Sequence, residues 1–399
     1  MPSSTLPTES AAPSLETPAS PRSIQIEDSD RYSRQILFPG IGLAGQQRLA
    51  SAHVAIIGCG ATGAATAALL ARAGVATLTL IDRDFVEPSN LQRQVLFDES
   101  DALECLPKAE AARRKIALFN STIAVHARIA DLVPANIDEL LASAHIILDA
   151  TDNFETRYLI NDYAVRQSIP WIYAAAIGAY AATMNILPPG LQPTAGHRQP
   201  ATACLACIFP KPPTGPVETC DTSGILSTAV NLAASLPVTE ALTLLTGQPH
   251  LMRRTLLSFD LWNLSPTSNG DTAVSNGYTA VSNGYLDRSE IATGSPRSGC
   301  EVCGLRIFTH LSGQNRAHIT LCGRDSVQIH EHHRPIDFAA LTARLQAHSE
   351  IQALRSNDLL LRFRRGPHTL TLFADGRAIV QGTTDITIAR SLYARFVGA

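Results

Sequence analysis

A glycine-rich turn joins an apolar segment to an alanine-rich segment near the start of the chain. The apolar segment, His53 to Gly58, has the composition of a buried parallel strand. The alanine-rich segment, Ala61 to Ala73, is followed by Gly74, a typical helix stop. The turn reads Gly58-Cys-Gly60-Ala-Thr-Gly63. A strand, such a turn and a helix are the context of a phosphate-binding loop, because glycines allow close approach and helix N-termini favour negative charge. The alternative is a glycine-rich turn without a ligand.

Beyond this turn, short apolar segments alternate with helical patterns. Strands are expected at 77–82, 122–128, 145–149 and 170–173, and helices at 107–119, 137–143, 154–167 and 227–246. The alternation predicts a Rossmann-like α/β fold with a doubly wound, mainly parallel sheet. Residues 173–187 are expected to lead into an antiparallel second half.

The chain divides into three regions by composition. Residues 1–24 are rich in Ser, Pro and Thr and are expected to be disordered. Residues 25–304 form the main domain, with 265–298 as a flexible insertion. That insertion contains two tandem copies of Thr-Ala-Val-Ser-Asn-Gly-Tyr. A repeat fold needs several stacked units, so two copies cannot form one. We interpret the repeat as a duplicated loop without a chemical role. Residues 305–399 predict a small α+β domain with a hairpin at Asp375-Gly376.

Charge and hydropathy exclude several classes of protein. A formal net charge of -3 gives no electrostatic case for a nucleic-acid partner. The most apolar run, 171–187, is interrupted by Gly178 and Asn185, so no membrane span is expected. The N-terminus lacks the basic start and apolar core of a signal peptide, and we expect a cytoplasmic protein.

Polar residues after the second strand indicate a nucleotide. Asp82 stands where a carboxylate accepts hydrogen bonds from ribose hydroxyls, which is compatible with both NAD and ATP. Asn90, Arg93 and Lys108 follow it, and such donors and cations suit a triphosphate better than a hydride-transfer site. ATP is therefore the favoured nucleotide.

Asp152 follows the strand expected at 145–149 and precedes a helix. Together with Asn153 it could cap that helix. Alternatively, its carboxylate could hold Mg²⁺ against the phosphates, because magnesium prefers oxygen ligands.

Two Cys-x-x-Cys pairs indicate a metal site, and they comprise Cys204, Cys207, Cys300 and Cys303. Four thiolates suit tetrahedral Zn²⁺, and in a reducing compartment matched pairs favour a metal over disulfides. Three histidines, His330, His332 and His333, form a second cluster that either binds metal or belongs to a solvated turn.

Taken in this order, these features resemble the ThiF/MoeB/HesA family of activating enzymes. The resemblance covers about Arg31 to Gly304 and begins with Arg31-Tyr-Ser-Arg34-Gln35. It implies ATP, Mg²⁺, a structural zinc, a homodimer and, as substrate, a small ubiquitin-fold sulfur-carrier protein with a Gly-Gly C-terminus. The family's second adjacent glycine is replaced by Ala61, and Leu106 stands where a Gly-Gln-like pair is usual.

The resemblance also implies roles for individual residues. Asp82 would bind ribose, and the phosphates would be bound by Asn90, Arg93 and Lys108. Asp152 would direct the magnesium, and Arg34 would reach the nucleotide of the other subunit. Cys220 matches a cysteine that in some members joins the carrier covalently during sulfur transfer from a donor such as a cysteine desulfurase. In other members that cysteine is dispensable, so an unreactive loop cysteine is the alternative.

The expected reaction needs no catalytic triad. A glycine carboxylate has a pKa of about 3.3–3.7, so it is already ionised and needs only positioning and charge stabilisation to attack ATP. The C-terminal region, including 321–328, 373–379 and 389–393, resembles the tail of some bacterial ThiF proteins, which favours a ThiS-like carrier of thiamine synthesis. The alternatives are a MoaD-like carrier of the molybdopterin pathway, an NAD-dependent oxidoreductase, and a nucleotide-binding scaffold without turnover.

Overall fold

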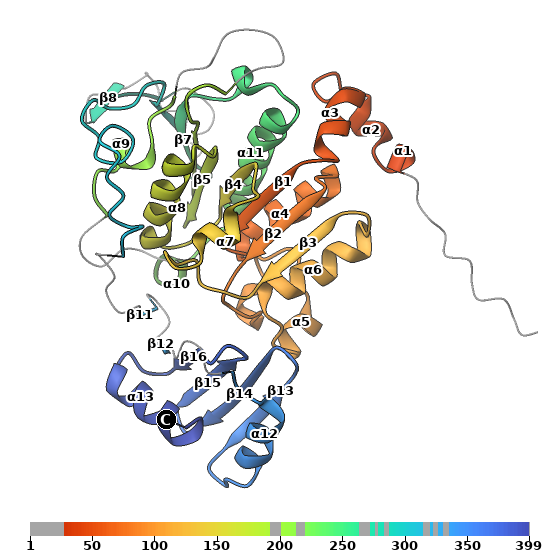
Figure 1. Ribbon diagram of the computed structural model, residues 1–399, viewed down its shortest axis with the longest axis vertical. Coiled ribbons are helices and arrows are strands. Elements are labelled where there is room, and N and C mark those ends of the chain that lie inside the picture. Colours follow the sequence, from red (N-terminus) through yellow and green to blue (C-terminus); the bar gives the residue numbers. More distant parts are fainter. Residues whose placement is uncertain are drawn as a thin grey trace, which may run out of the picture.

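The computed structural model describes residues 28–191, 201–212, 220–262, 272–275, 278–282, 287–313, 320–321, 326–329 and 335–398. The tail at 1–24 and the three clustered histidines lie outside these residues. Within them, a large sheet carries helices on both faces, and a small sheet with two helices follows at the C-terminal end (Figure 1).

The first half of the large sheet is parallel. Its strands lie in the order β3-β2-β1-β4-β5, and every neighbouring pair runs parallel. The bounds are β1 His53–Ile57, β2 Thr77–Ile81, β3 Ala124–Arg128, β4 Ile146–Asp149 and β5 Trp171–Ile177. The central strands β1 and β4 are covered on both faces, which explains their continuous apolar sequences, whereas β3 alternates between exposed and half-buried positions.

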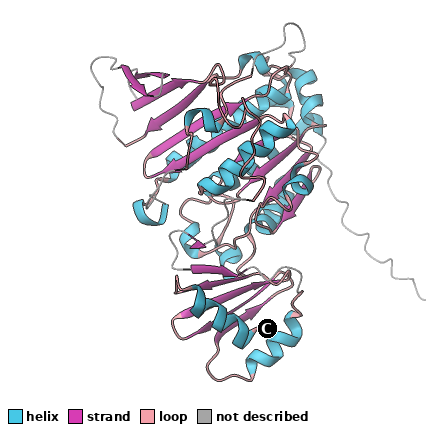
Figure 2. Ribbon diagram, turned by 60° about the vertical axis from the view of Figure 1, so that its left-hand side comes forward, coloured by secondary structure: helices cyan, strands magenta, loops and turns pink. Residues whose placement is uncertain are grey.

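Helices cover both faces of this sheet (Figure 2). One hydrophobic core lies under α4, α6 and α11, and a second lies under α7, α8 and α9. The bounds are α4 Ala61–Ala73, α5 Glu99–Leu103, α6 Lys108–Phe119, α7 Ile137–Leu141, α8 Phe154–Gln167, α9 Leu205–Ile208 and α11 Ser227–Leu245. Short helices complete the unit: α1 Asp28–Arg31, α2 Ser33–Ile36, α3 Gly42–Leu49, η1 Pro88–Asn90, α10 Cys220–Ser223 and η2 Pro249–Leu251. The predicted doubly wound fold is confirmed.

The second half of the large sheet is antiparallel, as expected. It continues through β6 Tyr180–Ile186, β7 Thr255–Asp260 and β10 Asp287–Ala292. Gly178, with φ of 56°, forms the turn between β5 and β6.

The prediction that the tandem heptapeptide is a loop is wrong for the described part of 265–298. The copies form β8 Thr272–Ser275 and β9 Tyr278–Ser282, which pair with each other, and β9 pairs with β10 at the end of the sheet. The Thr-Ala-Val-Ser stretch of each copy has strand composition, and the intervening Asn-Gly is a hairpin signal, so the duplication supplies both arms of a hairpin.

Helix α11 is long and apolar enough to meet a length-and-composition test for a membrane span. It also packs against α4 and over β5 and β6, as a core helix of the large sheet does (Figure 1). That arrangement accounts for its apolar sequence, so the test gives only weak evidence for a membrane.

The C-terminal unit, defined here as β11 to α13, is an antiparallel sheet with its own hydrophobic core. Its strands lie in the order β11-β12-β16-β15-β14-β13. The bounds are β11 Thr320–Leu321, β12 Ser326–Ile329, α12 Phe338–Gln346, β13 Gln352–Ser356, β14 Leu360–Arg365, β15 His368–Phe373, β16 Ala378–Gln381 and α13 Ile386–Phe396. Gly376, with φ of 93°, lies in the expected hairpin between β15 and β16.

Candidate nucleotide and metal sites

The turn after β1 brings the main chain close to two neighbouring elements. Gly58 has φ of 88°, and a Cβ atom there would lie 2.6 Å from the carbonyl oxygen of Ala150. A Cβ atom on Gly63 would lie 1.9 Å from the carbonyl oxygen of Gly58. Gly60 is the N-cap of α4 and has no side chain to bond the first N–H groups of the helix. The turn therefore presents main-chain N–H groups that can donate hydrogen bonds to an anion.

A cavity of about 420 Å³ opens beside this turn, at the carboxyl ends of the parallel strands. It is lined by several residues predicted for nucleotide binding: Gly58, Gly60, Asp82, Arg93, Lys108 and Asp152. Gly63 lies inside α4, Asn90 lies in η1, and Arg34 is exposed on α2, so these three do not line it. The cavity occupies the place where open α/β sheets bind ligands.

Asp82 joins the glycine turn to the end of β2. Its Oδ2 accepts the N–H of Cys59 at 2.5 Å, and its Oδ1 accepts the N–H of Asp84 at 2.7 Å. Burial raises the pKa of Asp82, while Lys108 and the two N–H donors lower it. The carboxylate retains lone pairs for a ligand hydroxyl, because each oxygen can accept more than one hydrogen bond.

Two cations at the cavity are held by carboxylates. Lys108 is buried, and its Nζ lies 3.2 Å from Oδ2 of Asp84. Arg83, which sequence reasoning missed, donates from Nη1 to Oδ1 of Asp131 at 2.9 Å. Burial lowers the pKa of Arg83, but Asp131, Asp84 and Asp152 outweigh it and raise that pKa. Cations fixed in this way are suited to bind phosphate.

A buried ion pair supports the loop after β4, and the sequence did not reveal it. Nε of Arg157 donates to Oδ2 of Asp149 at 3.2 Å, and Nη2 donates to the carbonyl of Thr151. The guanidinium also lies 5.1 Å from the centre of the Tyr173 ring. Burial raises the pKa of Asp149, and Arg157 opposes that rise. The pair fixes the main chain immediately before Asp152.

Helix capping and a place in the cavity lining, the two alternatives for Asp152 and Asn153, belong to different residues of the pair in the structure. Asn153 caps α8, because its side chain accepts the N–H of Thr156 at 2.9 Å. Asp152 lines the cavity together with its neighbour Thr151. A carboxylate in the lining of this cavity is the kind of oxygen donor that Mg²⁺ prefers, so the residues present fit that ion.

The 3-10 turn η1 positions the segment that follows it. Asn90 is buried, and its Oδ1 accepts the N–H of Glu87 at 3.0 Å. This hydrogen bond stabilises the turn. The carbonyl of Asn90 accepts the N–H groups of Arg93 and Gln94. Gln94 also lines the cavity, and its Oε1 has no hydrogen-bond partner among the described residues. Gln94 is therefore a further candidate for binding a ligand.

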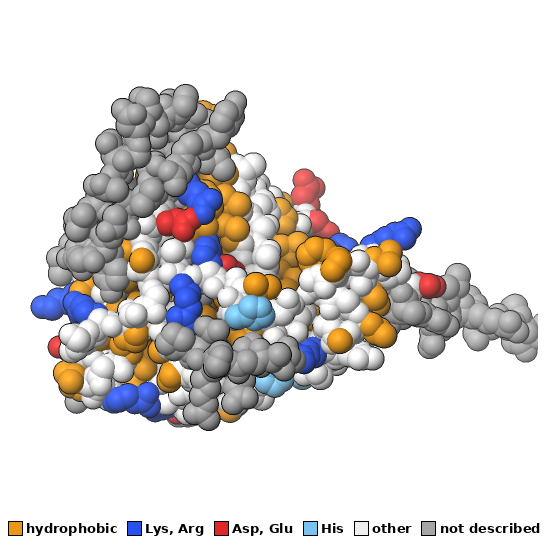
Figure 3. Space-filling model, turned by 90° about the horizontal axis from the view of Figure 1, so that it is seen from above, with side chains coloured by type: hydrophobic (Ala, Val, Ile, Leu, Met, Phe, Trp, Pro, Cys, Tyr) orange, Lys and Arg blue, Asp and Glu red, His pale blue; other side chains and the backbone are white. Residues whose placement is uncertain are grey.

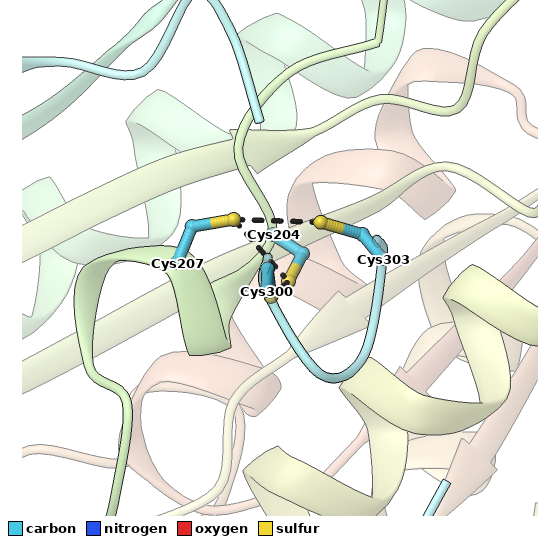
Figure 4. Close-up of side chains that lie close together, drawn as sticks. All are labelled: Cys204, Cys207, Cys300 and Cys303. Atoms are coloured by element: carbon cyan, nitrogen blue, oxygen red, sulfur yellow. Dashed lines mark hydrogen bonds between the residues drawn. The ribbon is translucent and has the colours of Figure 1, made fainter. Parts of the chain in front are cut away.

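The four cysteines form one cluster. Their sulfur atoms point toward a common centre (Figure 4) and all lie within 4.8 Å of one another. The Sγ atoms of Cys204 and Cys300 are 3.7 Å apart, and those of Cys207 and Cys303 are 3.4 Å apart. A tetrahedron with Zn–S bonds of about 2.3 Å has edges of about 3.8 Å, so the spacing fits zinc. A disulfide needs about 2.05 Å and does not fit.

Neighbouring N–H groups complete this metal site. Asn161 donates from Nδ2 to Sγ of Cys204 at 3.8 Å, and the N–H of Arg297 donates to Sγ of Cys207 at 3.3 Å. Such donors stabilise thiolates and orient them toward a metal. Four protein ligands would leave no position for water on a zinc bound there, as in structural zinc sites.

Cys220 begins the short helix α10. Its side chain lies outside the described residues. Its proposed role stays a prediction.

Comparison with known proteins places the chain among relatives along almost its whole length. The ThiF family profile matches residues 32–275. The chain is 40% identical over 372 residues to "Sulfur carrier protein ThiS adenylyltransferase" of Bacillus subtilis, covering 92% of this chain and 99% of the relative. The Escherichia coli protein of the same name is 37% identical over 220 residues, covering 55% and 82%.

Other similar proteins match a smaller share of the chain. "Probable adenylyltransferase/sulfurtransferase MoeZ" of Mycobacterium tuberculosis is 37% identical, and the match covers 63% of this chain and 62% of that protein. The solved structure of E. coli MccB with ATP aligns with a TM-score of 0.52 at 22% identity, covering 69% of this chain and 74% of that one. This structural likeness supports the fold alone.

Proposed function

The chain belongs to the ThiF family and is an adenylyltransferase acting on a sulfur carrier, and we propose that its carrier is ThiS-like, as in thiamine thiazole synthesis. The observation that carries this choice is the length of the match to the B. subtilis relative, which includes the C-terminal unit. The MoeZ match covers much less of the chain, so a MoaD-like carrier is the second candidate. The family match weighs against an NAD-dependent oxidoreductase.

The proposed reaction joins two anions. A C-terminal glycine carboxylate oxygen attacks the α-phosphorus of ATP, the P–O bond to the β-phosphate breaks, and pyrophosphate leaves with its electron pair. Lys108, Arg93 and Arg83 stabilise the phosphate charge, together with the main-chain donors of the glycine turn. Mg²⁺ bound at Asp152 would neutralise charge and orient the phosphates. Asp82 is proposed to accept hydrogen bonds from the ribose.

A homodimer is proposed to complete the site. Arg34 is exposed on α2 and does not line the cavity of its own chain. Hydrophobic side chains are visible on the face seen from above (Figure 3). In the N-terminal segment, Leu37, Phe38 and Leu43 are exposed. We expect this face to meet a second copy, so that Arg34 reaches the partner's nucleotide. Analytical ultracentrifugation that finds only monomer at working concentrations would contradict the dimer.

Sulfur transfer is proposed to follow adenylation. A Cys220 thiolate would attack the acyl carbon of the acyl-adenylate and displace AMP, which gives a thioester. Alternatively, a Cys220 persulfide loaded by a donor such as a cysteine desulfurase would displace AMP to give an acyl disulfide, and a second thiol would reduce its S–S bond to release the thiocarboxylate. The donor and a cytoplasmic location remain proposals.

The test of the activity is carrier-dependent exchange of pyrophosphate into ATP. Asp152→Asn should fold normally and lose at least about 100-fold in exchange rate, the scale of one preorganised charge. Asp138→Asn is the matched control, because Asp138 pairs with Arg166 on an exposed surface. Wild-type exchange in Asp152→Asn would remove that carboxylate from the mechanism. ATP binding without exchange with either carrier would favour a scaffold without turnover.

A further inference from the structure

The C-terminal unit contacts the large-sheet unit at residues next to those that line the nucleotide cavity. An apolar cluster joins the two, with Phe85 and Cys105 on one side and Leu360, Phe373 and Ile379 on the other. Phe85 immediately follows Asp84, the carboxylate that holds Lys108, and its main chain pairs with Pro107 immediately before that lysine. The contact therefore lies next to Asp84 and reaches Lys108 through the main-chain pairing of Phe85 with Pro107.

A polar path connects the C-terminal unit to Arg83. Asp131 lines the cavity and accepts from Arg83 with Oδ1, while its Oδ2 accepts from Nε2 of Gln328 on β12. Arg377 lies nearby, with Nη1 4.0 Å from Oδ2 of Asp131 and Nη2 donating to the carbonyl of Ile129 at 2.7 Å. One carboxylate thus holds a cavity cation with one oxygen and the C-terminal unit with the other.

Arg377 is itself fixed in place. It is 3% exposed, its Nε donates to Oδ2 of Asp375 at 2.6 Å, and its guanidinium lies 4.7 Å from the centre of the Phe373 ring. A buried arginine with so many partners is held in one geometry, so Ile129 and Asp131 receive a rigid contact.

A second polar path reaches η1. Glu87 accepts from Nε2 of Gln381 at 3.3 Å and lies 3.9 Å from Nη2 of Arg362. The same Glu87 shares a reciprocal capping pair with Asn90. That turn leads directly to Arg93, which lines the cavity.

We propose that the C-terminal unit positions the phosphate-binding cations, with Gln328 acting through Asp131 on Arg83 and Gln381 acting through Glu87 on η1. The inference rests on the proposed function, since it assigns these cations to ATP phosphates. Gln328 and Gln381 are positioning residues, because they touch neither the cavity nor its ligand. Without them, Asp131 and Glu87 gain rotamer freedom, and the cations lose the fixed geometry that a polyanion requires.

The test measures the Kd of Mg·ATP by calorimetry, without any carrier. Gln328→Ala should raise that Kd about 5-fold, within the range by which residues outside a ligand site alter binding. Arg395→Ala is the control, because Arg395 pairs with Glu350 within the C-terminal unit. The Kd of Arg395→Ala should equal the wild-type value. The melting temperature of Gln328→Ala should match that of Arg395→Ala.

A double-mutant cycle separates positioning from general loss of structure. If Gln328 acts through Asp131, Gln328→Ala should have no further effect on Kd in an Asp131→Ala background. An undiminished effect in that background, or an unchanged Kd in the single variant, would overturn the first path. If Gln328→Ala does not fold, Gln381→Ala replaces it, and an unchanged Kd there would overturn the proposal.

The Kd also separates this inference from the proposed function. A wild-type chain that binds ATP but exchanges no pyrophosphate with any carrier defeats the proposed function, and the variant Kd values still decide the positioning role. A wild-type chain that binds no ATP overturns both.

Discussion

Gly63→Ala tests whether helix packing sets the position of the phosphate turn. The added Cβ would lie 1.9 Å from the carbonyl oxygen of Gly58, whereas real Cβ atoms stay beyond 3.0 Å. The turn and α4 must therefore separate by more than an ångström. The opposing atom belongs to the main chain, so no side-chain rotation relieves the clash, and we expect the upper end of the overpacking range, about 3 kcal/mol of unfolding free energy.

This loss should appear in two measurements. Thermal unfolding should show a Tm about 6–12 °C lower, at about 2–4 °C per kcal/mol for a large domain. Exchange of pyrophosphate should fall about 100-fold, because a displacement of this size at a reacting site costs about that much. Gly294→Ala is the control, because a Cβ there meets nothing within 4 Å. A Gly63→Ala protein with wild-type Tm and wild-type KM for ATP would refute the reasoning.

Three further predictions concern the metal, the buried ion pair and the thiol. Elemental analysis should find about one zinc per chain in wild-type protein, and Cys303→Ser should lose it and melt earlier; zinc-free wild-type protein would contradict this. Arg157→Met should lower the free energy of unfolding by about 3–5 kcal/mol in denaturant titrations, because Asp149 stays buried without its partner; a loss below about 1 kcal/mol would show that the pair contributes little. Cys220→Ser should keep pyrophosphate exchange and slow thiocarboxylate formation, measured by intact mass of the carrier; equal thiocarboxylate rates would make this cysteine a bystander.

Residues that follow directly on a strand were the most accessible to sequence reasoning. Asp82 and Asp152 come just after β2 and β4, and parallel strands carry their carboxyl ends to one edge, so both reach the same cavity. The four cysteines were equally accessible, because their spacing alone specifies a tetrahedral set.

Residues whose role depends on tertiary contacts were not accessible. Arg157 lies on α8 and resembles any surface arginine until Asp149 is seen buried beside it. Arg83 is one charge among several after β2, and its partner Asp131 lies beyond β3. The structural role of Asn90 was also not accessible, because its Oδ1 accepts the N–H of Glu87 within η1, while its predicted contact with phosphate stays a prediction. The heptapeptide was interpreted from its polar residues, although its strand character depends on β10 as a partner.

The cysteine cluster lies close to the point where the chain returns from the hairpin of β8 and β9, which bears on how long that hairpin can be. The segment that contains the hairpin begins after β7, inside the sheet, and ends with β10, which pairs with β7. Strand β10 leads to Cys300 and Cys303. A zinc bound by the four cysteines would fix the position of the chain that follows β10. Added length then costs only the slow logarithmic entropy of a longer loop. We therefore expect a change in the length of this hairpin to leave the return of the chain at Cys300 and Cys303 in place.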